Sequence, residues 1–133
     1  MEKKFINPPT LATPRGYTHV VTASGGKTVF ISGQVAFDVK GALVGKGDLQ
    51  AQATQAYANL QAALAAVGAT FADVVKMNTY VVNFTTADLP VIREVRAQLF
   101  PQENLPASTL VGVQALAFDG LLIEVEAIAM VKE

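Results

Sequence analysis

Apolar and polar residues alternate strictly near the end of the chain, from Leu121 to Val131. The odd positions of this segment are all apolar, whereas the even positions include Glu124 and Glu126. Successive side chains of a strand point to opposite faces, so the segment predicts a strand with one dry face and one face that carries two acids. Residues 107–115 predict a preceding strand, and Asp119-Gly120 favours a reversal between the two. The pattern therefore predicts a closing β-hairpin.

Two segments show the three- and four-residue spacing of apolar positions that is typical of amphipathic helices. The first lies between Asp48, a favourable N-cap, and Gly68, a typical helix stop. Its apolar stripe consists of Leu49, Ala53, Ala56, Tyr57, Leu60, Ala63, Leu64 and Val67. The second helix is predicted to be capped by Thr86 or Asp88, with Pro90 in its first turn and Pro101 beyond its end. Its stripe is Leu89, Ile92, Val95 and Leu99, and Arg93 and Arg96 lie off this stripe.

The remaining strands are predicted from β-branched and alternating segments. They are a short edge strand at 4–6, strands at 18–22 and 28–32 joined as a hairpin through Gly25-Gly26, and a strand at 74–82. Gly33-Gln34 breaks the strand at 28–32, either as a bulge or where a ligand approaches the backbone. The order β-β-loop-α-β-α-β-β favours one α+β domain, 1–133, with a mixed sheet and both helices on one face. The other face is left bare, which favours a closed ring of subunits.

Composition narrows the class of protein. Hydrophobic residues make up 51% of the chain and charged residues 16%, against an average charged share of about 25%, so we expect a partner subunit to cover part of the surface. The net charge of −1, without a basic run, argues against nucleic-acid binding. The chain has no Cys and a single His, His19, which disfavours thiol chemistry, a Ser-His-Asp triad and a metal site. Without a signal peptide or membrane span, we expect a soluble cytoplasmic protein.

Five short motifs occur in a shared order and spacing over nearly the whole chain. They are Gly16-Tyr17, Ile31-Ser32-Gly33-Gln34, Val67-Gly68 at a helix end, Val74-Val75-Lys76 with Tyr80-Val81, and Ile123-Glu124-Val125-Glu126-Ala127-Ile128-Ala129. In these motifs the chain resembles the RidA/YjgF family of reactive-intermediate (enamine/imine) deaminases. The resemblance implies a chorismate-mutase-like α+β fold, a homotrimer, and small-molecule clefts between neighbouring subunits.

The resemblance also implies a chemistry. Members hydrolyse enamine and imine intermediates, released by enzymes that use pyridoxal phosphate, to 2-oxo acids and ammonia, without a cofactor or metal. By this resemblance Glu124 is the catalytic candidate, which holds or polarises the attacking water. Gly33 offers its backbone N–H to the ligand, Ser32 lies beside it, and Tyr17 closes the cleft. Without the resemblance, Glu124 is a solvated acid or an acid in a subunit contact.

One position departs from the family pattern. Deaminase members read Pro-Ala-Arg where this chain has Pro106-Ala107-Ser108. The arginine clamps the substrate carboxylate through a planar fork with two charge-assisted hydrogen bonds, whereas serine offers one neutral donor. Arg93 or Arg15 is the candidate replacement cation, and the alternative is that both are ordinary exposed charges.

Two functions therefore stay open. The first is a RidA-type hydrolase with an altered substrate range. The second is a non-catalytic trimer that binds a small metabolite or has a regulatory role. RNA cleavage ranks far behind, because the charge and the lone His19 weigh against it. The predicted hairpin adds a geometric problem, since it separates Ser108 from Glu124 by about 13 Å. Either a bulge shifts the register, or one site uses two chains.

Overall fold

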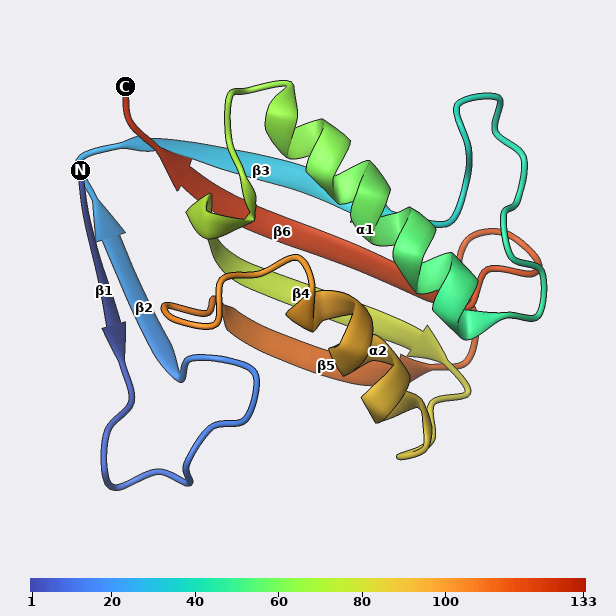
Figure 1. The fold of residues 1–133 in the computed structure, drawn as a ribbon, viewed down its shortest axis with the longest axis horizontal. Helices are drawn as coiled ribbons and strands as arrows, with labels where there is room; N and C mark the ends of the chain where they lie inside the picture. Colours follow the sequence, from blue (N-terminus) through green and yellow to red (C-terminus); the bar gives the residue numbers. More distant parts are fainter.

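The structure is a computed structural model that describes all residues, 1–133. A four-stranded mixed sheet forms the centre of the molecule, both helices lie on one of its faces, and a two-stranded ribbon stands beside it (Figure 1). The elements are β1 (Glu2–Ile6), β2 (Val20–Ser24), β3 (Lys27–Gln34), α1 (Leu49–Ala65), the 3₁₀ helix η1 (Phe71–Asp73), β4 (Val74–Val82), α2 (Asp88–Ala97), β5 (Ala107–Val113) and β6 (Ile123–Val131). The predicted α+β fold with a mixed sheet and one-sided helices is confirmed.

The predicted closing hairpin is wrong. The strand order is β3-β6-β4-β5, so β6 lies between β3 and β4, and β5 pairs in parallel with β4 instead of with β6. The apolar face of β6 is buried along its whole length, which suits a central strand, whereas β5 is partly exposed and forms the sheet edge. The turn at Asp119-Gly120 does form, with Gly120 at φ +86°, but it joins strands that are not neighbours.

The predicted hairpin through Gly25-Gly26 is wrong for a similar reason. The chain does turn there, with Gly25 at φ +74°, yet β2 pairs with β1 and β3 pairs with β6. Val29 and Ile31 of β3 pack against the hydrophobic core. This burial draws β3 into the main sheet and leaves β2 to the two-stranded ribbon.

The two helices differ in how they begin. Asp48 caps α1 as predicted, because its carboxylate accepts a hydrogen bond from the Ala51 N–H at 3.0 Å. The prediction for α2 is wrong: its N-cap is Ala87, which makes no side-chain hydrogen bond. Asp88 instead accepts a hydrogen bond from the Thr85 N–H at 3.0 Å, so its carboxylate closes the preceding turn.

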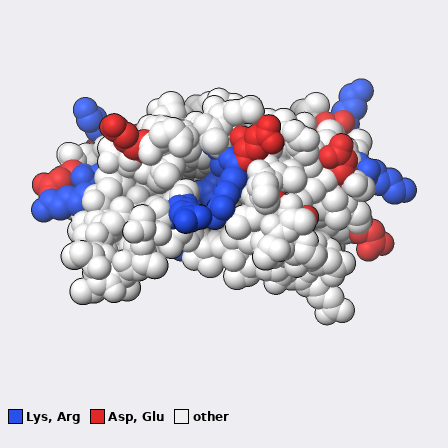
Figure 2. Space-filling view, turned by 60° about the horizontal axis from the view of Figure 1, so that its bottom comes forward, with Lys and Arg blue, Asp and Glu red and all other residues white.

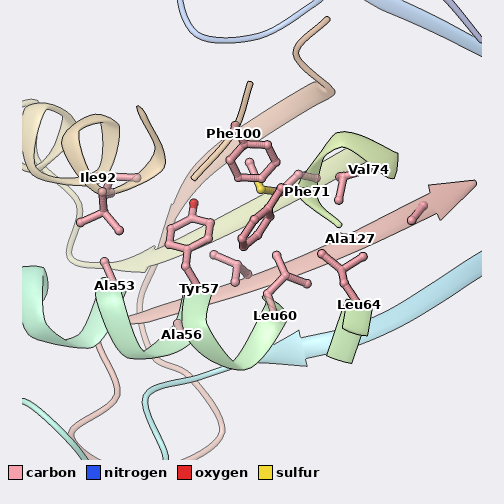
Figure 3. Close-up of a cluster of buried hydrophobic side chains, with 14 of the residues drawn as sticks. Ala53, Ala56, Tyr57, Leu60, Leu64, Phe71, Val74, Ile92, Phe100 and Ala127 are labelled. Carbon is pink, nitrogen blue, oxygen red and sulfur yellow. The ribbon is translucent and has the colours of Figure 1, made fainter. Parts of the chain in front are cut away.

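The hydrophobic core fills the space between the helices and the sheet (Figure 3). Leu60 and Leu64 of α1 and Ile92 of α2 are fully buried against the apolar faces of β4 and β6. No helix covers the opposite sheet face, which we call the bare face. Neither helix has the length and apolar character needed to cross a membrane.

Candidate functional site

A cavity of about 380 Å³ opens between α2, β5 and the segment that precedes β2. Its polar lining consists of Arg15, Tyr17, Arg93, Arg96, Gln102 and Ser108, and its apolar lining includes Leu89, Ile92, Phe100, Leu105 and Leu110. We call this space the arginine cavity. Three of the residues predicted from sequence, Tyr17, Arg93 and Ser108, therefore meet in one place, together with Arg15.

Helix α2 supplies two of the three guanidinium groups. Leu89, Arg93 and Arg96 follow one another at spacings of four and three residues, which places them on one face of a helix. That face points into the arginine cavity. Arg96 was not among the predicted site residues, although its spacing from Arg93 is the signal that could have found it.

The segment around Tyr17 is held against the start of β5 and against α2 by hydrogen bonds to backbone carbonyls. The Thr18 N–H donates to the Pro106 carbonyl at 3.1 Å, and the Thr18 hydroxyl donates to the Leu105 carbonyl at 2.5 Å. Arg96 Nη2 donates to the Gly16 carbonyl at 3.2 Å. These bonds connect residues far apart in sequence and bring Tyr17 beside Ser108.

The arginine cavity is positive and has no internal counter-charge. No acidic residue lines it, and the ion pairs of the chain, Lys3–Asp73 and Lys4–Glu2, lie elsewhere. Burial lowers the pKa of Arg96, the Tyr57 hydroxyl opposes this effect, and the charge of Arg93 adds to it. Arginine stays protonated at neutral pH even so. Basic atoms occupy a hollow at the middle of the molecule (Figure 2), and such a site favours an anionic ligand.

The other predicted residues, Ser32, Gly33 and Glu124, meet on the bare face. Between Ile31 and Gln34 the register of β3 against β6 shifts, so Ser32 and Gly33 together oppose one residue, Glu126. This is a β-bulge, which confirms that interpretation of Gly33-Gln34. A Cβ atom on Gly33 would overlap the Glu124 carboxylate and would lie 2.6 Å from its Cδ atom. Glu124 therefore occupies the space that the missing side chain leaves.

A second acid on the bare face is already engaged. Glu126 accepts hydrogen bonds from the Tyr80 hydroxyl at 2.5 Å and from Asn78 Nδ2 at 3.1 Å. The bond to Glu126, with the nearby charge of Glu124, raises the pKa of Tyr80. Glu124 itself makes no side-chain hydrogen bond or ion pair within the chain. Of the two acids, Glu124 is the one free to hold a water molecule or ligand.

Ser108 and Glu124 lie on opposite faces of the same sheet. Ser108 shares the helix-covered face with Leu110, which packs against the core, whereas Glu124 alternates with the buried Ile123 and Val125. They also stand two strands apart, since Ser108 pairs with Met77 and Glu124 with Tyr80. Register shifts occur in β3 between Ile31 and Gln34 and in β4 between Val74 and Lys76, and neither changes this separation. Within one chain, the two residues cannot contact the same small ligand.

No three His, Asp or Glu side chains gather where they could bind a metal ion. The lone His19 is half-buried just before β2, where its Nε2 atom lies 2.6 Å from the Ala12 carbonyl oxygen. It belongs to neither group of site residues.

Comparison with known proteins places these motifs in a family. The family model described as endoribonuclease L-PSP matches residues 9–131. A 2-iminobutanoate/2-iminopropanoate deaminase from Dermatophagoides farinae is 34% identical over 131 residues, which cover 98% of each chain.

Solved structures agree with that assignment. A Rid-family protein of unknown function from Yersinia pestis is 43% identical, with a TM-score of 0.87 over 98% of this chain and 100% of that chain. The structure of TdcF from E. coli with bound serine is 29% identical, with a TM-score of 0.69 over 83% of this chain and 85% of that chain. The chain therefore belongs to the endoribonuclease L-PSP family, which is the RidA/YjgF family that its motifs resemble.

Proposed function

We propose that the protein hydrolyses enamine or imine intermediates of amino acids to 2-oxo acids and ammonia, in a cleft formed by two copies of the chain. One copy contributes the arginine cavity with Tyr17 and Ser108, and its neighbour contributes Glu124 and Gly33. The observation that carries the proposal is the placement of these two groups on opposite faces of one sheet. Two deaminase relatives of this chain, from Dermatophagoides farinae and Homo sapiens, support the reaction type.

Imine hydrolysis requires a positioned water molecule, a group that accepts and donates a proton, and groups that bind the substrate. The water oxygen bonds to the imine carbon while the Glu124 carboxylate accepts a proton from it. That proton passes to the nitrogen, which gives an intermediate with a hydroxyl and an amino group on one carbon. The hydroxyl proton then also moves to the nitrogen through Glu124, the carbon–nitrogen bond breaks, and ammonia leaves as the hydroxyl oxygen becomes the carbonyl oxygen. Nothing is oxidised or reduced, so the step needs no redox cofactor.

The arginine cavity takes over the task of the missing family arginine. The side chains of Arg15 and Arg93 make no hydrogen bond or ion pair within the chain, so their guanidinium donors are available to a substrate carboxylate. Ser108 and Tyr17 add hydroxyl groups to the same wall. The substitution at Ser108 thus changes the geometry of carboxylate binding without removing positive charge from the site.

The bare face supports assembly into a homotrimer. Phe30 is 77% exposed and Val111 40% exposed on this face, and Ile128 lies beside Phe30 in the pairing of β3 with β6. A shallow hollow of about 290 Å³ next to them is lined by Lys76, Asn78 and Glu126, among others. A neighbouring subunit would bury this apolar surface and bring its own arginine cavity towards Glu124.

The first experiment measures ammonia and 2-oxo acid release from freshly generated imino acids. We expect turnover above buffer, and a loss on the order of a hundredfold in Glu124→Gln. Glu94→Gln, an exposed acid of α2 outside the cavity lining, makes the same charge change and should keep full activity. No turnover by the unaltered protein at high concentration, on a panel of imino acids, would refute the hydrolase.

The second experiment tests the two-copy site. Glu124→Gln and Arg93→Gln each damage every cleft when expressed alone. When they are co-expressed, roughly a quarter of the clefts in a mixed ring contain an intact residue from each side. We expect the mixed assembly to be more active than either variant alone. If the mixture is no more active than either variant alone, Glu124 and Arg93 do not act on the same substrate from two different subunits.

The departure at Ser108 favours a second candidate, a trimer that binds a small metabolite without turning it over. In that case 2-oxo acids or amino acids would bind in the arginine cavity, and Ser108→Arg would create imine hydrolysis where the natural chain has none. Hydrolysis by the natural chain with a dependence on Glu124 would exclude this candidate.

A further inference from the structure

We propose that the preferred substrate carries two negative charges, as in the imine of a dicarboxylic amino acid. The inference rests on the proposed function, and it names the substrate class of the same cleft. It is drawn from the charge, the donors and the size of the arginine cavity.

The first argument is the number of fixed charges. Three guanidinium groups line the cavity, and none has a carboxylate within ion-pair distance. The neighbour's Glu124 brings one negative charge to the cleft, so two positive charges remain to be balanced. A monocarboxylate would pair with one of the two guanidinium groups that are free of hydrogen bonds, whereas a dicarboxylate can give Arg15 and Arg93 one carboxylate each.

The second argument is the division of tasks among the arginines. Arg96 is fixed by its bond to the Gly16 carbonyl at 3.2 Å and by its position over the Phe100 ring, 5.7 Å from Cζ to the ring centroid. Arg15 and Arg93 have no such partners and are exposed at the mouth of the cavity. Two free forked donors suit two separate carboxylates, because each fork can bind one carboxylate through two hydrogen bonds.

The third argument is size and polarity. The cavity of about 380 Å³ falls within the range of about 300–1,000 Å³ that drug-sized ligands occupy. An imino acid with three or four carbons, such as those in the names of the deaminase relatives, would leave much of it empty. Leu89, Ile92 and Leu110 line its interior, which suits a short methylene chain between two charged ends.

The experiment compares substrates and products of matched structure. Turnover is measured with 2-iminoglutarate and 2-iminopropanoate, each generated in place, and binding of their products, 2-oxoglutarate and pyruvate, is measured by calorimetry. We expect kcat/KM and affinity to favour the dicarboxylate by about tenfold or more, since a charge-assisted pair adds about that factor. Arg15→Gln or Arg93→Gln should reduce this preference to less than about threefold. Lys46→Gln, an exposed cation outside the cavity, should leave it unchanged.

The possible failures are distinguishable. Equal or better use of 2-iminopropanoate, with equal product affinities, would overturn the dicarboxylate preference and leave imine hydrolysis intact. The protein could instead bind 2-oxoglutarate about tenfold more tightly than pyruvate, lose this preference in the arginine variants, and show no imine turnover. That result would support a binding site for dicarboxylates and refute the proposed hydrolase activity. A preference that survives both arginine substitutions would show that the second carboxylate binds elsewhere, which also overturns the inference.

Discussion

Gly33 controls the place of the proposed catalytic acid. The Glu124 carboxylate fills the volume that any side chain at position 33 would take, and the bulge at this point keeps the backbone of Gly33 out of the regular ladder. The absence of a Cβ atom is needed here for close approach, because φ of Gly33 is not positive. Gly33 therefore positions Glu124 by leaving room for its carboxylate, and not through an unusual backbone conformation of its own.

Gly33→Ala should displace Glu124 and lower imine turnover on the order of tenfold or more, since small misplacements of reacting groups are costly. The free energy of unfolding should change by less than about 1 kcal/mol, because the flexible end of Glu124 can move aside. Activity assays and urea denaturation measure the two effects. In Gly33→Ala combined with Glu124→Gln, the alanine should add no further loss. A full additive loss would contradict an action through Glu124.

Tyr57 is a second residue whose surroundings matter, because they determine its hydrogen bonding and its pKa. Its side chain is fully buried, and neither its hydroxyl nor that of the buried Thr79 makes a hydrogen bond of ordinary geometry. In Figure 3 its oxygen points away from α1, on the side of Ile92 and Phe100. Burial raises the pKa of Tyr57 above the ordinary 10.0, and the nearby Arg96 and Thr79 oppose this rise only in part.

Tyr57→Phe removes a buried polar group without a partner, so the free energy of unfolding should rise by about 1 kcal/mol at pH 8. A raised pKa in the folded state contributes stability that is present below pH 10.0 and is lost as the pH rises through the raised value. The unaltered protein should therefore lose stability faster than the variant as the pH rises from 10.0 towards the raised value. Urea denaturation between pH 8 and pH 11 measures both differences, and equal pH profiles would contradict the linkage.

At the scale of elements, a buried glutamine joins α1 to the loop before β6. Gln52 is fully buried, and its Nε2 atom donates to the carbonyls of Gly120 at 2.9 Å and Gly45 at 3.2 Å. Its Oε1 atom accepts from the Leu122 N–H at 2.8 Å. The amide thus satisfies backbone groups on two loops and sets where β6 enters the sheet, close to Glu124.

Gln52→Leu should lower the free energy of unfolding by about 2 kcal/mol, because it takes the side-chain partner away from three part-buried backbone groups. Gln61→Leu makes the same chemical change at an exposed position of the same helix and should change stability by less than about 0.5 kcal/mol. Chemical denaturation of both variants gives the comparison. Equal effects at the two positions would show that the buried amide contributes nothing specific.

At the scale of the whole molecule, the bare face should hold the subunits together. Phe30→Asp places a charge at its most exposed apolar residue and should shift the oligomer towards monomers, because burying an unpaired carboxylate is unfavourable. Val39→Asp, in a fully exposed loop position, should leave the assembly intact. Sedimentation velocity at several protein concentrations measures the mass. An unchanged oligomer in Phe30→Asp would show that subunits meet elsewhere.

The loss of assembly should also remove activity, since Glu124 and the arginine cavity then belong to separate molecules. A variant that is monomeric, folded and still fully active would contradict a cleft built from two copies of the chain.

Much of the local structure could be predicted from the sequence, because short-range chemistry decides it. The alternation in β6, the stripe and Asp48 cap of α1, and the break at Gly33-Gln34 each depend on neighbours within a few residues. Strand partners depend instead on contacts across the whole chain, and both predicted hairpins failed for that reason. The Asp-Gly and Gly-Gly turns form, but a turn does not decide which strand lies beside the next.

The candidate site also combines features that could be predicted from the sequence with features that depend on contacts across the whole chain. The sequence by itself determined the family motif, the acid at Glu124 on the face of its strand opposite the apolar one, and the departure at Ser108. It could not assign a face to Ser108, because β5 carries small or apolar residues at most positions and burial favours neither side clearly. Only the tertiary structure decided that Ser108 and Glu124 lie on opposite faces and that Arg15, Arg93 and Arg96 surround one cavity. The physical reason is that this arrangement follows from the packing of α2 and of the Tyr17 segment on β5, through contacts between residues about 80 to 90 positions apart.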